Sequence, residues 1–334
     1  MLVSDFNYNL PEDRIAKFPP KIRGTTRLLV LDKKTGKLKD SYYKDLVDFL
    51  NPGDLLILND TRVMQSRLFC ALPDGRRREL VVLEKHGDEP QRVMYRGKLH
   101  DGDELYINDS KIIITKILGN GIAEVESTVP LSTLTEKYGT VPLPPYLHRD
   151  ATNDDKKRYQ TVWARSMGSA AAPTASLNMT EELLEKLQKK GIIIKYITLH
   201  VGLGTFLPIR TDNVEDHKMH SEWYSVPEDT CEAIIKARFD GKGARVIALG
   251  TTVARTLEYL GDTGVKEGEN DIFIYPGYEF KTIDGLITNF HAPKSTVLML
   301  TAAFAGWDNL KNAYDHAVKE KYNFLSYGDS MFIC

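Results

Sequence analysis

The alternation of strand-like and helix-like segments in the second half of the chain constrains the fold more than any other feature. Residues 180–191, TEELLEKLQKKG, are typical of a helix, because Thr180 can cap the start, leucines recur at helical spacing and a glycine can end it. The apolar run 192–199 follows and predicts a buried strand. The same order returns at 244–261 and 284–306. This alternation predicts an α/β domain with a largely parallel sheet.

A different pattern occupies the chain between about residues 63 and 142. Short β-prone runs alternate there with turns rich in glycine, aspartate and proline, which predicts a small all-β domain. Residues 54–60, DLLILND, form one more strand-like segment that has no sheet of its own. We therefore expect residues 1–62 and 149–334 to form one discontinuous α/β domain, with residues 63–148 as an inserted β-barrel-like domain. A cleft would then lie between the two domains.

Charge and cysteine content narrow the class of protein. The formal net charge of −2 gives no overall attraction to nucleic acid, so RNA could only meet local basic runs such as Arg76–Arg78 and Lys156–Arg158, each of which also suits an ordinary solvated surface. No apolar run approaches the roughly 20 residues of a membrane span, and we expect a cytoplasmic protein. Cys70, Cys231 and Cys334 show no CxxC spacing, which indicates reduced thiols and no zinc cage.

Two of the expected helices begin with hydroxyl side chains. Thr251 and Thr252 follow Gly250, where capping by a threonine and binding of a carboxylate or phosphate are both open, and Ser295 or Thr296 can cap the other helix. Carboxyl ends of parallel strands meet at one rim of a sheet, where ligands of open α/β sheets bind. Both helix starts are therefore expected at a ligand site.

Other candidates for binding or chemistry stand at strand ends and turns. They are His200, Gly202 and Gly204 after 192–199, Arg255 one turn into the helix at 251, Asn289 and His291 after 284–288, and Asp329 in a turn near the C-terminus. The glycines let a backbone approach a ligand closely, but they also suit a flexible turn. The histidines can also be structural residues whose ring nitrogens are hydrogen-bonded at a strand end. The aspartate can also simply form a turn.

The segment HKMHSEW places His217 three residues before His220, with Glu222 close behind. On a helix the two imidazoles would share a face, which suits either a metal ion or general-base catalysis. No third ligand is evident at a suitable spacing. We therefore expect hydrogen-bonding or general-base histidines and no metal.

Taken in order, several segments closely resemble the S-adenosylmethionine:tRNA ribosyltransferase-isomerase family of queuosine biosynthesis. The segments are VPLPPYLHRD (141–150), RYQTVWA (158–164), GSAAAPTASLNMT (168–180), TLHVGLGTFLPI (198–209), HKMHSEW (217–223), GTTVARTLE (250–258), IFIYPGYEF (272–280), LITNFHAPKSTVLMLTAAFAG (286–306) and FLSYGDSMFI (324–333). The resemblance covers nearly the whole chain. It implies an α/β domain with a β-barrel domain, and a monomer with no obligate protein partner.

The resemblance also implies the reaction. The ribosyl part of S-adenosylmethionine, a co-substrate, moves to the 7-aminomethyl-7-deazaguanine (preQ1) wobble base in a tRNA anticodon stem-loop and isomerises, giving epoxyqueuosine-tRNA, adenine and methionine. The sulfonium acidifies the C5′ hydrogens, so a base can open the ribose; the amine then adds to the vinyl sulfonium, and a hydroxyl displaces methionine. This route needs a general base, an anion site and an apolar bed, but no metal or redox cofactor.

From the resemblance we expect S-adenosylmethionine at the rim formed by the loop 168–180, the turn 200–206 and the helix start 250–255. The base candidates are His200, His217, His220 and His291, with His220 and Glu222 as a coupled pair. Thr251 and Arg255 would take the methionine carboxylate, and Tyr159 and Gln160 would contact substrate. The other expected binding residues are Gly168, Ala172, Pro173, Thr174, Ala175, Asn178, Gly202, Gly204, Thr205, Asn289 and Asp329.

The chain departs from the family pattern in three places. Ser176, Asn178 and Met179 stand where the family carries glycine, histidine and phenylalanine; Phe18 stands where glutamine is expected; and YRGKLHDGD (95–103) replaces an RPGK-like segment. An asparagine cannot take up a proton near neutral pH. The alternatives are therefore a divergent paralogue with the same nucleoside pocket and another acceptor, a non-enzymatic RNA-binding module, and a metal-dependent hydrolase built on the histidine pair.

Overall fold

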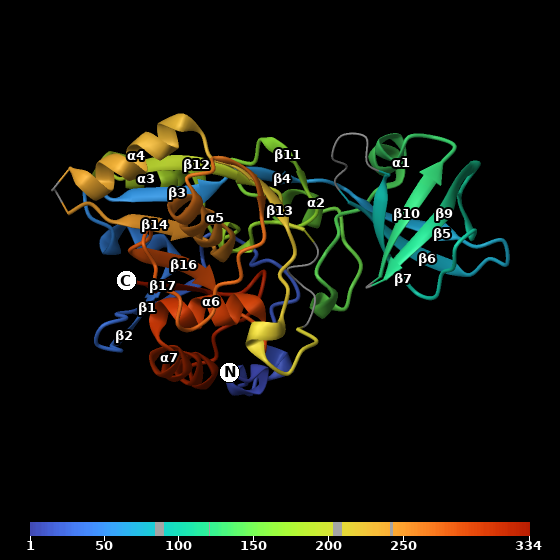
Figure 1. Ribbon diagram of the computed structural model, residues 1–334. Coiled ribbons are helices and arrows are strands. Elements are labelled where there is room, and N and C mark those ends of the chain that lie inside the picture. Colours follow the sequence, from blue (N-terminus) through green and yellow to red (C-terminus); the bar gives the residue numbers. More distant parts are fainter. Residues whose placement is uncertain (84–89, 120, 203–208, 241–242) are drawn as a thin grey trace.

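The computed structural model describes residues 1–83, 90–119, 121–202, 209–240 and 243–334, which form a sheet domain and a barrel that stand side by side (Figure 1). Both chain termini lie on the sheet domain, away from the barrel. Strands from before and after the barrel share one sheet, so the predicted α/β class with an inserted all-β barrel is confirmed. The predicted boundaries at 62/63 and 148/149 stay a prediction.

The large sheet has nine strands in the order β15-β13-β12-β3-β14-β16-β17-β1-β2. Their bounds are β1 Arg27–Leu31, β2 Leu38–Tyr42, β3 Leu55–Asn59, β12 Ile193–Leu199, β13 Glu222–Ser225, β14 Val246–Leu249, β15 Glu267–Asn270, β16 Gly285–Asn289 and β17 Ser330–Ile333. The four adjacent strands β12, β3, β14 and β16 are parallel to one another, and β1 is parallel to β17. The pairs β12–β13, β13–β15, β16–β17 and β1–β2 are antiparallel. The parallel prediction therefore holds for the centre of the sheet, which positions the site.

Helices cover both faces of this sheet. Their bounds are α3 Glu181–Lys190, α4 Glu228–Phe239, α5 Thr251–Thr263, α6 Thr296–Ala305 and α7 Trp307–Lys319, and the 3-10 segments are η1 Val3–Phe6, η2 Glu12–Arg14, η3 Tyr43–Phe49, η4 Pro145–Leu147, η5 Thr174–Ser176 and η7 Val214–Asp216. In β3, Leu56 and Leu58 pack toward α3 and η3, while Leu55 and Ile57 pack in the core that α4 to α7 cover. The two cores follow from the two-residue period of a strand.

Local capping explains where two helices begin. Thr180 Oγ1 accepts a hydrogen bond from Leu183 N at 3.1 Å, and Gly191 ends α3 with φ of 93°. Ser295 Oγ accepts a hydrogen bond from Leu298 N at 3.2 Å, so Ser295, and not Thr296, caps α6. Both side chains satisfy amide groups that the helix itself leaves unpaired.

The inserted barrel is closed, with the strand order β10-β7-β6-β5-β8-β9. Its strands are β5 Arg67–Ala71, β6 Arg77–Val82, β7 Arg92–Arg96, β8 Glu104–Ile107, β9 Ser110–Gly119 and β10 Ile122–Ser127, and the helix α1 Leu131–Tyr138 packs on it. A separate apolar cluster fills its interior. The short strands β4 Thr61–Val63 and β11 Ser166–Ser169 pair in parallel, and α2 Asp155–Arg158 follows the return of the chain to the sheet domain.

Three further features of the described residues concern the cysteines, the length of the helices and possible metal ligands. Cys70 and Cys231 are buried and Cys334 is half-buried, and all three are free thiols. Within the described parts of the chain, no helix combines the length and apolar character of a membrane span. Among the same residues, no three His, Cys, Asp or Glu side chains gather as a metal-binding group.

Candidate active site

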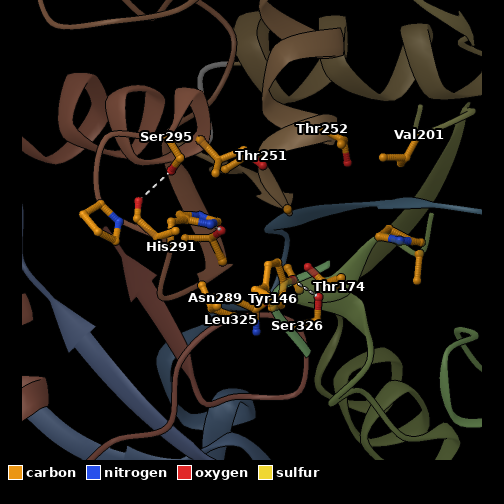
Figure 2. A pocket seen from close by; sticks show the side chains of 18 of the residues that line it. Tyr146, Thr174, Val201, Thr251, Thr252, Asn289, His291, Ser295, Leu325 and Ser326 are labelled. Carbon is orange, nitrogen blue, oxygen red and sulfur yellow. Dashed lines mark hydrogen bonds between the residues drawn. The ribbon is translucent and has the colours of Figure 1, made fainter. Parts of the chain in front are cut away.

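A cavity of about 380 Å³ lies where the strands β14 and β16 deliver the helices α5 and α6 (Figure 2). Its walls come from residues 172–175, from the start of α5 at 250–252, from the loop 288–295, and from Leu325 and Ser326. The volume lies within the roughly 300–1,000 Å³ typical of small-molecule sites. The cavity therefore stands at the rim where the sequence predicted a ligand.

The starts of two helices, α5 and α6, line this cavity. The residue before α5 is Gly250, with φ of 103°, and no described side chain caps this helix. Thr251 and Thr252 both lie within the helix and line the cavity, so of the two interpretations left open by the sequence, capping by a threonine is excluded. Backbone N–H groups left unpaired at a helix start bind anions. The start of α5 therefore offers donors to a carboxylate.

Asn289 contributes an unsatisfied acceptor to the same cavity. The residue is 2% exposed, and its Nδ2 donates to Asp329 O at 3.3 Å. Its Oδ1 is buried and has no hydrogen-bond partner among the described residues. Buried polar atoms without a partner are rare and unfavourable, so this oxygen is suited to a donor on a bound ligand.

His291 lies beside Asn289 in the cavity wall (Figure 2). Its Nε2 is 2.8 Å from Thr288 Oγ1. Loss of hydration lowers the pKa of His291 to about 3, because burial disfavours the charged imidazolium. The ring is therefore neutral near pH 7.

Lys294 and Tyr146 also line the cavity, and neither was predicted from the sequence as a site residue. Lys294 lies in the left-handed region with φ of 57°, held by a backbone hydrogen bond from its N to Phe6 O at 2.9 Å. Its ammonium group has no ion pair with any described residue. The Tyr146 hydroxyl shares a hydrogen bond with Ser326 Oγ, and burial raises the pKa of Tyr146. Lys294 is near the predicted His291 in the sequence, which is the signal that could have found it.

His200 supports the cavity wall from behind. It is 9% exposed, stacks on Trp223 with ring centroids 5.1 Å apart, and places Nδ1 2.8 Å from Thr61 Oγ1. A Cβ added at Gly168 would lie 2.5 Å from His200 Nε2, so Gly168 packs against the ring and does not line the cavity. The next residue, Val201, does line it.

The segment with His217, His220 and Glu222 is not a helix, so the two imidazoles do not share a helical face. Residues 217–221 follow η7 outside any helix or strand, and Glu222 begins β13. His217 contacts Phe273 edge-on with ring centroids 5.1 Å apart. Loss of hydration, followed by the nearby His220, lowers the pKa of His217. None of the three residues lines the 380 Å³ cavity.

Glu222 and Arg255 form a buried ion pair instead. Glu222 Oε2 accepts from Arg255 Nη1 at 2.8 Å, and Glu222 Oε1 accepts from Gly202 N at 2.9 Å. Arg255 also donates Nε to Ile272 O at 3.1 Å, and it is 4% exposed. Since these partners occupy its guanidinium, Arg255 is not placed to take a substrate carboxylate. The ion pair of Glu222 differs from the predicted coupling to His220.

Tyr159 and Gln160 hold the framework behind the site. Tyr159 is fully buried and meets Tyr327 edge-on at 5.9 Å between ring centroids. Gln160 binds both backbone groups of Val63, since Oε1 accepts from the N–H at 3.0 Å and Nε2 donates to the carbonyl at 2.8 Å. Both residues therefore contact protein, not the cavity.

Asn178 and Asp329 shape the turn next to the cavity floor. Asn178 is 2% exposed and its Nδ2 donates to Gly328 O at 3.0 Å and to Ser330 Oγ at 3.2 Å. Asp329 Oδ1 accepts from Arg27 N at 2.7 Å, and burial raises the pKa of Asp329. Neither side chain lines the cavity, whereas the predicted residues Ala172, Pro173, Thr174, Ala175, Thr251, Asn289 and His291 do.

Two further predicted residues, Gly204 and Thr205, lie outside the described residues. The basic runs are partly engaged in local contacts. Arg76 pairs with Asp74 at 2.6 Å, the guanidinium of Arg77 lies 3.7 Å from the ring centroid of Phe69, and Arg158 donates to a backbone carbonyl.

Comparisons with known proteins agree over the full length. The family described as "Queuosine biosynthesis protein" matches residues 3–333. A protein of Pelodictyon phaeoclathratiforme, named S-adenosylmethionine:tRNA ribosyltransferase-isomerase, is 55% identical over 342 residues, with all of both chains covered. A protein of the same name from Francisella tularensis is 44% identical, again with full coverage. The crystal structure of S-adenosylmethionine tRNA ribosyltransferase from Thermotoga maritima matches with a TM-score of 0.57 and 32% identity, covering 99% of this chain and 100% of that chain.

Proposed function

The chain belongs to the queuosine biosynthesis protein family, and we propose on this premise that the cavity in Figure 2 is its S-adenosylmethionine site. Relatives of full length are named S-adenosylmethionine:tRNA ribosyltransferase-isomerase, so the chain is a transferase-isomerase of this class. These relatives give no support to a paralogue with a different acceptor. The finer assignments are part of the proposal: the acceptor is the preQ1 wobble base of an anticodon stem-loop, and the enzyme acts where tRNA is modified, in the cytoplasm.

The observation that carries the proposed site is the convergence of an uncapped helix start with the unpartnered Oδ1 of Asn289 in one cavity. The methionine carboxylate would accept from the N–H groups at the start of α5 and pair with the ammonium group of Lys294. A ribose hydroxyl would donate to Asn289 Oδ1. The apolar residues 172–175 would lie against the adenine.

His291 is the base that we propose for the C5′ proton. It is the one predicted base candidate that lines the described part of this cavity. Its low pKa keeps the ring neutral, so it can accept a proton without first losing one, but it also makes the ring a weak base. The adjacent sulfonium compensates, because it acidifies the hydrogens on C5′. Proton removal then opens the ribose, adenine leaves, the tRNA amine adds, and a hydroxyl displaces methionine.

Calorimetric titration with S-adenosylmethionine tests the site. Asn289→Ala should weaken binding about tenfold, because one hydrogen bond to a ligand contributes roughly 0.5–1.5 kcal/mol. Asn323→Ala is the matched control, since Asn323 is exposed and outside the cavity. Equal affinities of wild type and Asn289→Ala would remove the cavity as the site.

The activity has its own test. Wild-type protein is incubated with S-adenosylmethionine and tRNA carrying preQ1, and mass spectrometry follows adenine, methionine and the modified nucleoside. All three should form together. Binding of the tRNA without any of these products would contradict the proposed reaction. Elemental analysis of protein purified without added metal tests the expectation that no metal is needed.

A further inference from the structure

A second and larger cavity, of about 610 Å³, lies between the barrel and the segment that returns the chain to the sheet domain. One wall comes from Arg67, Glu79, Met94, Tyr95 and Arg96 on the strands β5, β6 and β7, and the other comes from residues 143–150. The second wall is most of the segment VPLPPYLHRD, which resembles the family and of which only Tyr146 lines the site described above. The cavity therefore joins both domains through an unassigned motif.

We propose that this cavity holds an unpaired nucleotide of the tRNA substrate, next in sequence to the base that is modified. This inference rests on the proposed function. It goes further by assigning a site for a second nucleotide, with its base in the cavity and its phosphate on Arg96.

The 610 Å³ cavity lies next to the 380 Å³ cavity of the active site. Pro145 and Tyr146 are consecutive residues of η4, yet Pro145 lines the 610 Å³ cavity and Tyr146 lines the 380 Å³ cavity. Consecutive Cα atoms are about 3.8 Å apart, so the two cavities border the same turn of chain. Neighbouring nucleotides of an unpaired strand can span such a separation.

The side chains of the cavity suit an RNA nucleotide. Met94 is half-buried and offers a polarizable side chain to a base, and the guanidinium of Arg149 also lines the cavity. The ring of Tyr95 packs on the apolar cluster inside the barrel. Proteins bind unpaired bases by stacking them on aromatic rings and guanidinium planes. Glu79 and Asp150 also line the cavity, and their carboxylates can accept from the N–H groups on a base edge.

Arg96 is the cation available for a phosphate. Arg67 pairs with Glu79 at 2.9 Å, and Arg149 pairs with Asp155 at 2.7 Å. The guanidinium of Arg96 is exposed and has no hydrogen bond or ion pair with any described residue. An arginine without a counter-ion at the edge of a cavity is suited to bind a phosphate.

The return segment is held in a shape that keeps the cavity open. His148 has φ of 49° and ψ of 37°, a left-handed conformation that is uncommon for histidine, and its side chain is exposed at the cavity. Arg149 is fixed by its bidentate contacts with Asp155, at 2.7 and 2.8 Å, and its guanidinium lies 4.2 Å from the ring centroid of Phe18. Phe18 is itself 61% exposed, so an aromatic ring is available beside the cavity.

Binding of anticodon stem-loop RNA to the full-length protein tests the proposal. Arg96→Gln should weaken binding about tenfold and lower the slope of log K against log salt by about 0.7–0.9, the value for one phosphate contact. Lys116→Gln is the matched control, because Lys116 is an exposed cation on β9 of the same barrel that neither lines the cavity nor belongs to the basic runs. Wild-type affinity of Arg96→Gln, or an equal loss in both variants, would overturn the proposal.

The base contact is tested with two stem-loops that lack the base on the 5′ or the 3′ side of the target. Phe18→Leu removes the exposed aromatic ring beside the cavity and should weaken binding of the intact loop about tenfold. One of the two abasic loops should bind wild type about tenfold more weakly, and on that loop Phe18→Leu should cost nothing further. Equal losses from Phe18→Leu on all three loops would overturn the assignment of the base.

A separate readout distinguishes this proposal from the function on which it rests. Arg96→Gln should bind S-adenosylmethionine with wild-type affinity and raise the KM for tRNA about tenfold with kcat nearly unchanged. Failure of wild type to release adenine would contradict the proposed function, while the RNA-binding comparison would still decide the second cavity. Loss of S-adenosylmethionine binding in Arg96→Gln would count against the second cavity as a separate site.

Discussion

Replacing His291 by glutamine should make the fold less sensitive to acid. The folded protein holds this imidazole with a pKa of about 3, below its ordinary value of 6.5, because burial disfavours the charged form. Below pH 6.5 the unfolded chain takes up a proton at His291 that the folded protein does not. Wild-type stability is therefore fully present above pH 6.5 and falls as the pH drops toward 3.

The expected magnitude follows from the same pKa. Each pH unit between about 6.5 and 3 should lower the free energy of unfolding by about 1.4 kcal/mol, so the contribution of His291 reaches about 2 kcal/mol at pH 5. This is an upper value, because His291 keeps part of its surface exposed. Glutamine carries no titrating group in this range and can still offer a nitrogen or oxygen to Thr288 Oγ1, which lies 2.8 Å from His291 Nε2.

Urea unfolding followed by circular dichroism at several pH values between 7.5 and 5 provides the assay. The free energy of wild type relative to His291→Gln should fall by about 2 kcal/mol between pH 7 and pH 5. His100→Gln is the control, since the side chain of His100 is 66% exposed on the barrel, and its curve should run parallel to that of wild type. Parallel curves for wild type and His291→Gln would refute the reasoning.

Three buried contacts should also affect stability or turnover when they are altered. Asn178→His should lower the melting temperature and leave ribosyl transfer no faster, because both hydrogen bonds of the buried amide nitrogen go to protein atoms and a neutral imidazole has one N–H; increased turnover would contradict this. Arg255→Met should lower the unfolding free energy in urea by about 3–5 kcal/mol, since it leaves Glu222 buried without its cation, and a change below about 1 kcal/mol would count against the pair. Gly168→Ala should also lower the melting temperature, because its Cβ would lie 2.5 Å from His200 Nε2; an unchanged melting temperature would show that the ring moves freely.

The fold was predictable where the signals are local. The caps Thr180 and Ser295 act within three residues of their partners; the sequence pattern identified Thr180 and limited the second cap to Ser295 or Thr296. The barrel was predictable for the same reason, because short strands and turns alternate along the chain. The start of α5 shows the limit: the sequence left a threonine cap open, but Gly250 takes the N-cap position and the helix begins at Thr251.

The site was predictable where strand ends fix positions, and less so where side-chain direction decides. Asn289 and His291 follow a central strand, so their place at the rim follows from topology. The pairing of Arg255 with Glu222 joins residues 33 apart, and the amide of Gln160 turns to Val63, 97 residues away. Periodicity indicates which residues share a face, but it does not show which partner a buried charge or amide will select.

Asn178 shows what this distinction means for catalysis. The family pattern has histidine at this position, which suggested that the catalytic base had moved or been lost. In the structure the side chain faces the turn at Gly328 and Ser330, and Leu325 and Ser326, just before that turn, line the cavity. Asn178 therefore acts on the shape of the cavity floor and not on a proton of the substrate. Exchange of histidine for asparagine there changes how the floor is held, and it leaves His291, the base that we propose, untouched.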